Sequence, residues 1–169
     1  MFSLRCTEQV LKCLKVKPDL ELPSSTTLLG DWYAKYLILD RQHFVVCCCD
    51  RTYLPVVVTA RDLAKLPRRL TQSLGDVLAA LSVPEDLIHD EQAAMREVVF
   101  GKTANRVATG VLVDYARMLD HPSTRMDDLI EISLGLAETP LFAGSPRVVF
   151  PNRATVRVFT EAAESRLLH

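Results

Sequence analysis

Residues 32–59 read WYAKYLILDRQHFVVCCCDRTYLPVVVT, and this stretch decides the fold class. Three runs rich in β-branched and aromatic residues are separated by two short polar turns. Because turns this short join neighbouring antiparallel strands, the stretch predicts a meander of strands over 32–39, 43–49 and 53–59. The nearly continuous valines of the last two runs are typical of strands that are covered on both faces.

Outside the meander, the spacing of apolar residues is mostly helical. A short strand over 2–6 and a helix over 7–16, capped by Thr7, are expected before it. After it we expect strands over 97–100 and 147–150, and helices over 63–81, 84–95, 105–119, 124–136 and 151–168. Since strands gather early and helices late, the sequence predicts one α+β domain over residues 1–169: an antiparallel sheet of about four to five strands covered by C-terminal helices.

The composition is that of an ordinary globular protein. The chain has 169 residues, of which 49% are hydrophobic and 24% are charged, and its formal net charge is −1. This balance disfavours a dedicated nucleic-acid binder, which needs many uncompensated Lys and Arg residues, although a local basic patch is compatible with it. The N-terminus has no signal-peptide pattern, and the most apolar stretch, 54–60, is too short to span a bilayer. We therefore expect a cytoplasmic protein without a membrane partner.

Three of the five cysteines are consecutive, at Cys47, Cys48 and Cys49. On a strand, Cys47 and Cys49 point to one face and Cys48 to the other. An odd number of cysteines with this spacing is not a disulfide framework, and small buried thiols in a reducing compartment are the favoured interpretation. A thiol nucleophile and a metal site remain alternatives. With no CxxC pair and only scattered histidines, the sequence predicts no metal and no cofactor.

One segment has part of a phosphate-binding loop. Gly101-Lys102-Thr103 follows an expected strand and precedes an expected helix, but the position where the motif needs its first glycine is Arg96. The segment is therefore interpreted as a strand-to-helix turn, whose free backbone N–H groups can hold an anion.

Two further segments fit local preferences poorly. Asn105 is a good cap for the helix over 105–119, but Gly110 in its middle costs about 1 kcal/mol relative to Ala. Such a glycine marks either close packing or room for a ligand. Arg106 and Asp114 share its face, so the stripe predicts either a polar pocket or an ion pair beside a tightly packed helix, and the second interpretation is favoured. Glu138, in Leu136-Ala137-Glu138-Thr139-Pro140, opposes the helix dipole, and we expect Arg5 or Arg106 as its partner.

Trp32 and Tyr33 directly follow Gly30-Asp31, at the junction of a loop and the first strand of the meander. An aromatic pair at such a junction can stack on a ligand or anchor the edge of the sheet, and the second interpretation is favoured.

These segments also carry a resemblance. The elements are Arg5-Cys6-Thr7, Gly30-Asp31-Trp32-Tyr33, residues 103–110 and residues 136–140. Together they resemble an uncharacterised bacterial family described only as a domain of unknown function, over nearly the whole chain. Two polar positions of the family pattern, a Ser and an Asn, are Val107 and Val113 here. The resemblance implies no established activity, only that these elements belong to one surface.

Two hypotheses about function follow. The favoured one is a non-catalytic binding or regulatory module that engages another macromolecule, preferably a protein and less readily a nucleic acid. The alternative is a small enzyme that acts on a nucleotide, RNA or another phosphate-containing ligand, with its side chains in one cleft. The candidate ligand-binding residues are Arg5, Asp31, Trp32, Tyr33, Lys102, Thr103, Asn105, Arg106, Asp114 and Glu138.

Overall fold

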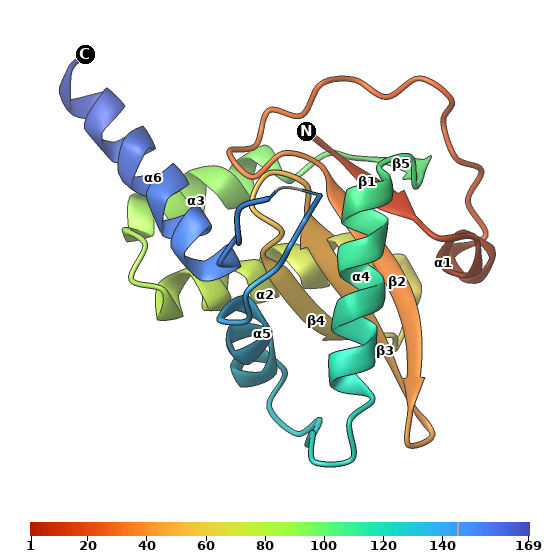
Figure 1. The fold of residues 1–169 in the computed structure, drawn as a ribbon. Helices are drawn as coiled ribbons and strands as arrows, with labels where there is room; N and C mark the ends of the chain where they lie inside the picture. The colour runs from red at the N-terminus through yellow and green to blue at the C-terminus, as the bar shows by residue number, and fades with distance from the viewer. Residues whose placement is uncertain (145) are drawn as a thin grey trace.

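The computed structural model describes residues 1–144 and 146–169, and these form an α+β domain around one open sheet (Figure 1). The strands are β1 (Phe2–Cys6), β2 (Trp32–Leu39), β3 (Gln42–Cys49), β4 (Pro55–Thr59) and β5 (Val98–Lys102). The helices are α1 (Glu8–Leu14), the short 3₁₀ helix η1 (Leu63–Lys65), α2 (Leu66–Ala80), α3 (Glu85–Ala94), α4 (Arg106–Leu119), α5 (Leu129–Ala137) and α6 (Pro151–Leu167).

The strand order is β4-β3-β2-β1-β5. Strands β2, β3 and β4 form the expected antiparallel meander. The prediction of a purely antiparallel sheet is wrong, however, because β1 pairs in parallel with both β2 and β5. Parallel neighbours need long crossover connections, and the segments 7–31 and 60–97 provide them. The sheet is therefore mixed.

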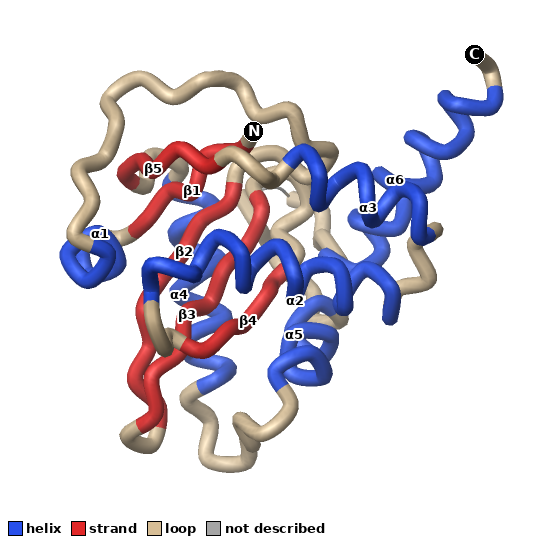
Figure 2. The backbone as a smooth tube through the Cα atoms, turned by 180° about the vertical axis from the view of Figure 1, so that it is seen from behind, coloured by secondary structure: helices blue, strands red, loops and turns tan. Residues whose placement is uncertain are grey.

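Helices lie on both faces of the sheet. Helix α2 packs on one face, where it contacts β4, and α4 packs on the other, where it contacts β2 and β3 (Figures 1 and 2). Helix α5 lies beside β4 at the edge of the sheet, and the Ser133 hydroxyl accepts a hydrogen bond of 3.0 Å from the Val57 N–H. This contact occupies a backbone donor of an edge strand that would otherwise be open to pairing.

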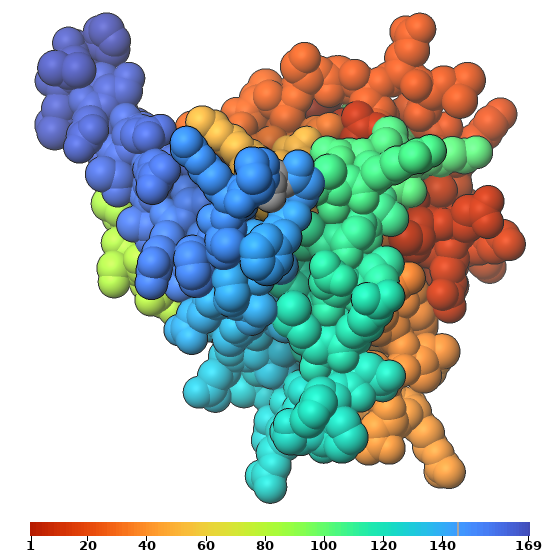
Figure 3. All heavy atoms as spheres, in the orientation of Figure 1, coloured from red at the N-terminus to blue at the C-terminus, as the bar shows by residue number. Residues whose placement is uncertain are grey.

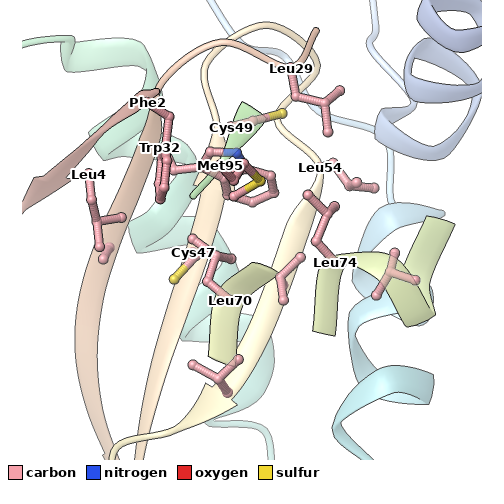
Figure 4. Packing of buried hydrophobic residues seen from close by; sticks show 14 of the residues in the cluster. Phe2, Leu4, Leu29, Trp32, Cys47, Cys49, Leu54, Leu70, Leu74 and Met95 are labelled. Atoms are coloured by element: carbon pink, nitrogen blue, oxygen red, sulfur yellow. The ribbon is translucent and has the colours of Figure 1, made fainter. Parts of the chain in front are cut away.

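The larger of the two hydrophobic clusters surrounds Trp32, whose side chain is fully buried (Figure 4). Cys47 and Cys49 belong to this cluster, whereas Cys48 belongs to the cluster under α4, as the strand alternation predicts. Burial raises the pKa of all three thiols and raises that of Cys6 to about 12. Because a thiolate is the reactive species, this environment fits packing and not nucleophilic chemistry.

Several local predictions are wrong. Gly101 and Lys102 do not form a strand-to-helix turn, because they belong to β5 and pair with Arg5 and Cys6 of β1. Residues 147–150 form no strand: Val149 makes only an isolated bridge with Leu141. The helix expected from residue 124 begins at Leu129, because Asp128 caps it by accepting the Glu131 N–H at 3.1 Å. No described helix is long and apolar enough to cross a membrane.

Candidate functional site

Helix α4 begins with a side-chain cap. The Asn105 Oδ1 accepts hydrogen bonds from the Val107 N–H at 2.9 Å and the Ala108 N–H at 3.3 Å. These bonds satisfy two of the backbone donors that a helix start leaves open, as the sequence predicts. The cap fixes the start of α4 and therefore the position from which the side chain of Arg106, its first residue, projects.

A groove runs along the exposed side of α4 and has a volume of 260 Å³. One wall is the stripe of Arg106, Gly110 and Asp114, which lie on successive turns of α4. The other wall is the segment 140–144, which follows α5. Figure 3 views this face, on which α4 and the chain leading to α6 lie side by side. The two segments that fit local preferences poorly therefore meet in space.

Gly110 leaves open space in this groove. A Cβ atom at this position would meet no heavy atom within 4 Å, so the glycine does not serve close packing. Of the two roles that a mid-helix glycine can have, this one provides room. The floor beside it is apolar and includes Val107, Val111 and Leu141.

In the wall opposite α4, a buried residue with two backbone hydrogen bonds is followed by an exposed aromatic residue. Leu141 is buried, and its N–H and C=O both bond with Val149 at 2.8 Å. The neighbouring Phe142 is 74% exposed although it lines the groove. An exposed aromatic ring beside a fixed backbone is a feature of contact surfaces, where aromatic residues are enriched.

The charges on the groove are not paired across it. Asp114 forms an ion pair with Arg117 at 3.7 Å on the same helix, and both side chains are more than half exposed. Arg106 has no carboxylate within 4.0 Å among the described residues. The ion pair expected between Arg106 and Asp114 is therefore not formed, and an exposed pair such as Asp114–Arg117 contributes little to stability.

A second group of candidates gathers where β1 and β2 lie side by side. The Arg5 Nε donates to the Asp31 Oδ2 at 3.2 Å, and the Arg5 guanidinium lies 6.0 Å from the centre of the Tyr33 ring. The Asp31 N–H in turn donates to the Asp50 Oδ1 at 3.1 Å. Gly30 has a φ of +80°, and a Cβ there would lie 2.3 Å from the same oxygen, so glycine is required beside this carboxylate.

Burial and neighbouring charges change the acidity of this polar cluster. Burial is the largest cause that raises the pKa of Asp50, and the negative charge of Asp31 raises it further. Burial also raises the pKa of Tyr33, while the Arg5 charge and a backbone hydrogen bond from Asn105 act in the opposite direction. The Asp31 Oδ1 and the buried Ser3 Oγ have no hydrogen-bond partner among the described residues.

The predicted residues thus do not share one cleft. Arg106 and Asp114 line the groove, and Arg5, Asp31, Tyr33 and Asn105 belong to the polar cluster around the start of α4. Trp32 lies in the core at the start of β2, which is the central strand, so it does not anchor the edge of the sheet as favoured from the sequence. Lys102 at the end of β5, Thr103 after it and Glu138 after α5 are not among the residues that line the groove.

The partner expected for Glu138 is also wrong. Arg5 pairs with Asp31 instead, and Glu138 is exposed and has no ion pair among the described residues. An exposed carboxylate remains hydrated, so an unfavourable helix dipole does not by itself require an ion-pair partner for it.

Sequence reasoning missed Asp50 and Phe142. The pairing of Trp32 with Cys49, continued by one residue, places Asp50 opposite Asp31, so the register of the meander could have found it. No local pattern distinguishes Phe142 from a core residue, because its exposure follows from the path of the chain after Pro140. Among the described residues, no three His, Cys, Asp or Glu side chains are grouped to hold a metal ion.

Both the groove and the polar cluster lie within residues 3–154, which match the model of a family described as a domain of unknown function (DUF6933). The chain belongs to this family. Membership confirms the resemblance inferred from the sequence elements, and the match covers most of the chain. No curated protein and no solved structure matches the chain.

Proposed function

We propose that this chain is a non-catalytic binding module that engages another protein through the groove between α4 and residues 140–144. The observation that carries the proposal is the open space over Gly110, between two walls whose charges do not pair across the groove. A glycine at this position lowers the stability of the helix by about 1 kcal/mol relative to Ala. A partner side chain that occupies the open space explains why a glycine is present despite this cost.

The size of the groove favours a protein side chain over a nucleotide. Its 260 Å³ lies below the range of about 300–1,000 Å³ that is usual for small-molecule pockets. One or two inserted side chains fit this space better than a whole nucleotide does. The enzymatic alternative, in contrast, needs its anion ligands and proton-transfer groups in one cleft, and the geometry divides them between two places.

The charges on the rim indicate the chemistry of the partner. Arg106 and Asp114 are eight residues apart on α4, which corresponds to about 12 Å along the helix axis. An extended chain covers this distance in about three to four residues. We therefore propose an extended segment with an acidic residue toward Arg106, a basic residue toward Asp114 and an apolar side chain between them over Gly110.

Selection of peptides from a random heptapeptide library on the purified chain tests this proposal. The chain should enrich sequences in which an acidic and a basic residue flank an apolar residue at this spacing. Gly110→Leu fills the groove and should abolish their binding, because the new side chain occupies the space over α4. Gly135→Leu is the matched control, since a Cβ at Gly135 on α5 also meets nothing within 4 Å but lies outside the groove.

Two results would overturn the proposal: a selection that enriches no such pattern, or peptides that bind Gly110→Leu as tightly as the unchanged chain. Circular dichroism of both variants shows whether each remains folded, so a loss of binding is not confused with a loss of structure.

A further inference from the structure

A second groove lies where the chain enters α6, and it is strongly basic. It has a volume of 430 Å³ and is lined by Arg147, Arg153 and Arg157 together with an apolar floor that includes Val148, Phe150 and Ala154. No Asp or Glu is among the described residues that line it. A positive groove of this kind attracts an anion.

The two arginines on α6 occupy positions where a positive charge is unfavourable for the helix. Arg153 is in the first helical turn, where the backbone dipole repels positive charge, and that turn contains no acidic residue. Arg157 follows it by four residues, so two like charges share one face of the helix, an arrangement that destabilises it. Glu161 is one turn further on, but no carboxylate lies within ion-pair distance of Arg157 among the described residues.

One guanidinium of the groove rests on an aromatic ring. The Arg153 guanidinium carbon lies 4.5 Å from the centre of the Phe150 ring, a distance typical of a cation–π contact. The start of α6 is also anchored to the body of the domain, because the Thr155 hydroxyl bonds with the Thr52 hydroxyl at 2.8 Å in a buried position. The basic side chains therefore project from a helix start that is anchored to the domain.

We propose that this groove binds a small organic phosphomonoester, with its phosphate on the arginines and its apolar body on the floor. Guanidinium groups form paired hydrogen bonds with phosphate oxygens, and a dianion compensates the two like charges of Arg153 and Arg157. The volume of 430 Å³ lies within the range of about 300–1,000 Å³ that is usual for small-molecule pockets. This site shares no lining residue with the proposed protein-binding groove, and Arg157 lies beyond the residues that the family model matches.

The chain provides its own control groove. A groove of 470 Å³ near α2 and α3 is lined by Arg68 and Arg96 together with Thr71, Gln72 and Gln92. It is similar in size but has two arginines instead of three, and the Gln92 amide donates to the Thr71 carbonyl at 3.1 Å. Arg68→Ala thus removes the same charge from a groove of similar size elsewhere.

Calorimetric titration of the full chain with phenyl phosphate at low salt and neutral pH tests the proposal. Arg157→Ala should weaken binding about tenfold or more, since a hydrogen bond between charged groups is lost. The double variant Arg153→Ala with Arg157→Ala should lose binding, and Arg68→Ala should retain it. Affinity should also fall as the pH drops below about 6, where a phosphomonoester loses its second charge.

Several results would overturn this assignment. If phenyl phosphate does not bind, or if Arg68→Ala loses as much affinity for it as Arg157→Ala does, the binding site is not at α6. Benzoate binding as tightly as phenyl phosphate would exclude recognition of a dianion. A short phosphotyrosine peptide that binds more tightly than phenyl phosphate would show that the phosphate belongs to a protein instead of a small molecule. Thermal unfolding of the double variant separates these outcomes from misfolding.

Discussion

Helices α2 and α4 cover opposite faces of the same sheet, and each has a glycine near its middle, but the two glycines face different surroundings. At Gly75 on α2, a Cβ would lie 2.3 Å from the amide nitrogen of Gln92 on α3. At Gly110 on α4, it would meet nothing within 4 Å. At Gly75 the Gln92 side chain of α3 occupies the place of a Cβ, whereas Gly110 keeps a surface open.

The contrast shows how little a helical glycine says by itself. Both residues interrupt an amphipathic helix, and both lower its intrinsic stability relative to Ala. Their roles depend on what lies opposite: α3 packs against α2, whereas α4 faces the irregular segment 140–144. A neighbour that is distant in sequence therefore determines whether the glycine serves packing or binding.

The largest expected effect tests this contrast directly. Gly75→Leu should lower the free energy of unfolding by about 1–3 kcal/mol, because the new side chain overpacks the interface of α2 with Gln92. Gly110→Leu should raise it by somewhat less than 1 kcal/mol, because Leu is a better helix former than Gly and finds open space. Urea denaturation of the two variants measures both changes.

Opposite signs at the two positions are the essential result. A destabilised Gly110→Leu variant would show that the groove is closed by contacts that the structure does not contain, and the contrast between the helices would fail. A neutral Gly75→Leu variant would show that Gln92 moves aside without loss.

An intermediate effect concerns how the two helices begin. Asn105→Ala should lower the free energy of unfolding by about 1 kcal/mol, because two N–H groups at the start of α4 lose their acceptor. Lys65, at the equivalent position before α2, makes no side-chain capping bond, so Lys65→Ala should change stability by about 0.5 kcal/mol or less. Chemical denaturation again measures both. Equal effects would mean that the cap on α4 does not contribute to its stability.

Much of this architecture follows from local patterns. The meander was predictable because short turns leave adjacent strands few alternatives, and the register follows from the turn at 40–41. The parallel pairing of β1 was not, because a short strand followed by a long connection can return on either side of the sheet. Helix α5 begins later than the sequence predicts because Ser123, Thr124 and Asp128 are all acceptable caps, and only packing selects among them.

Individual residues of the candidate site could be predicted from the sequence, but their proximity in space could not. Gly110 and Pro140 were each noticeable because they conflict with helical preference. That they line the same groove depends on the path from α4 through α5, which brings residues 140–144 back to α4. The members of the polar cluster are also distant in sequence: Arg5 and Asp31 meet only because β1 pairs with β2.

The smallest expected effect is a pH dependence on the α2 side of the sheet. Glu91 on α3 is 2% exposed, and its carboxylate accepts the N–H groups of Leu28 at 2.8 Å and Leu29 at 3.1 Å. Burial raises the pKa of this carboxyl above its usual value, although both hydrogen bonds oppose the change. Because the causes partly cancel, the effect on stability should be modest.

The sign of this effect is defined. A raised pKa means that the folded state binds the proton more tightly than the unfolded state does, so the contribution of Glu91 to stability falls as the pH rises. Glu91→Gln removes the titration, and the unfolding free energy of the unchanged chain minus that of the variant should therefore decrease as the pH rises from about 4, near the usual pKa of a glutamate carboxyl, toward neutrality. Urea denaturation in steps across this range measures the difference. A difference that grows with pH would show that the two N–H donors outweigh burial, and that Glu91 anchors the loop before β2 as a carboxylate whose pKa is lowered.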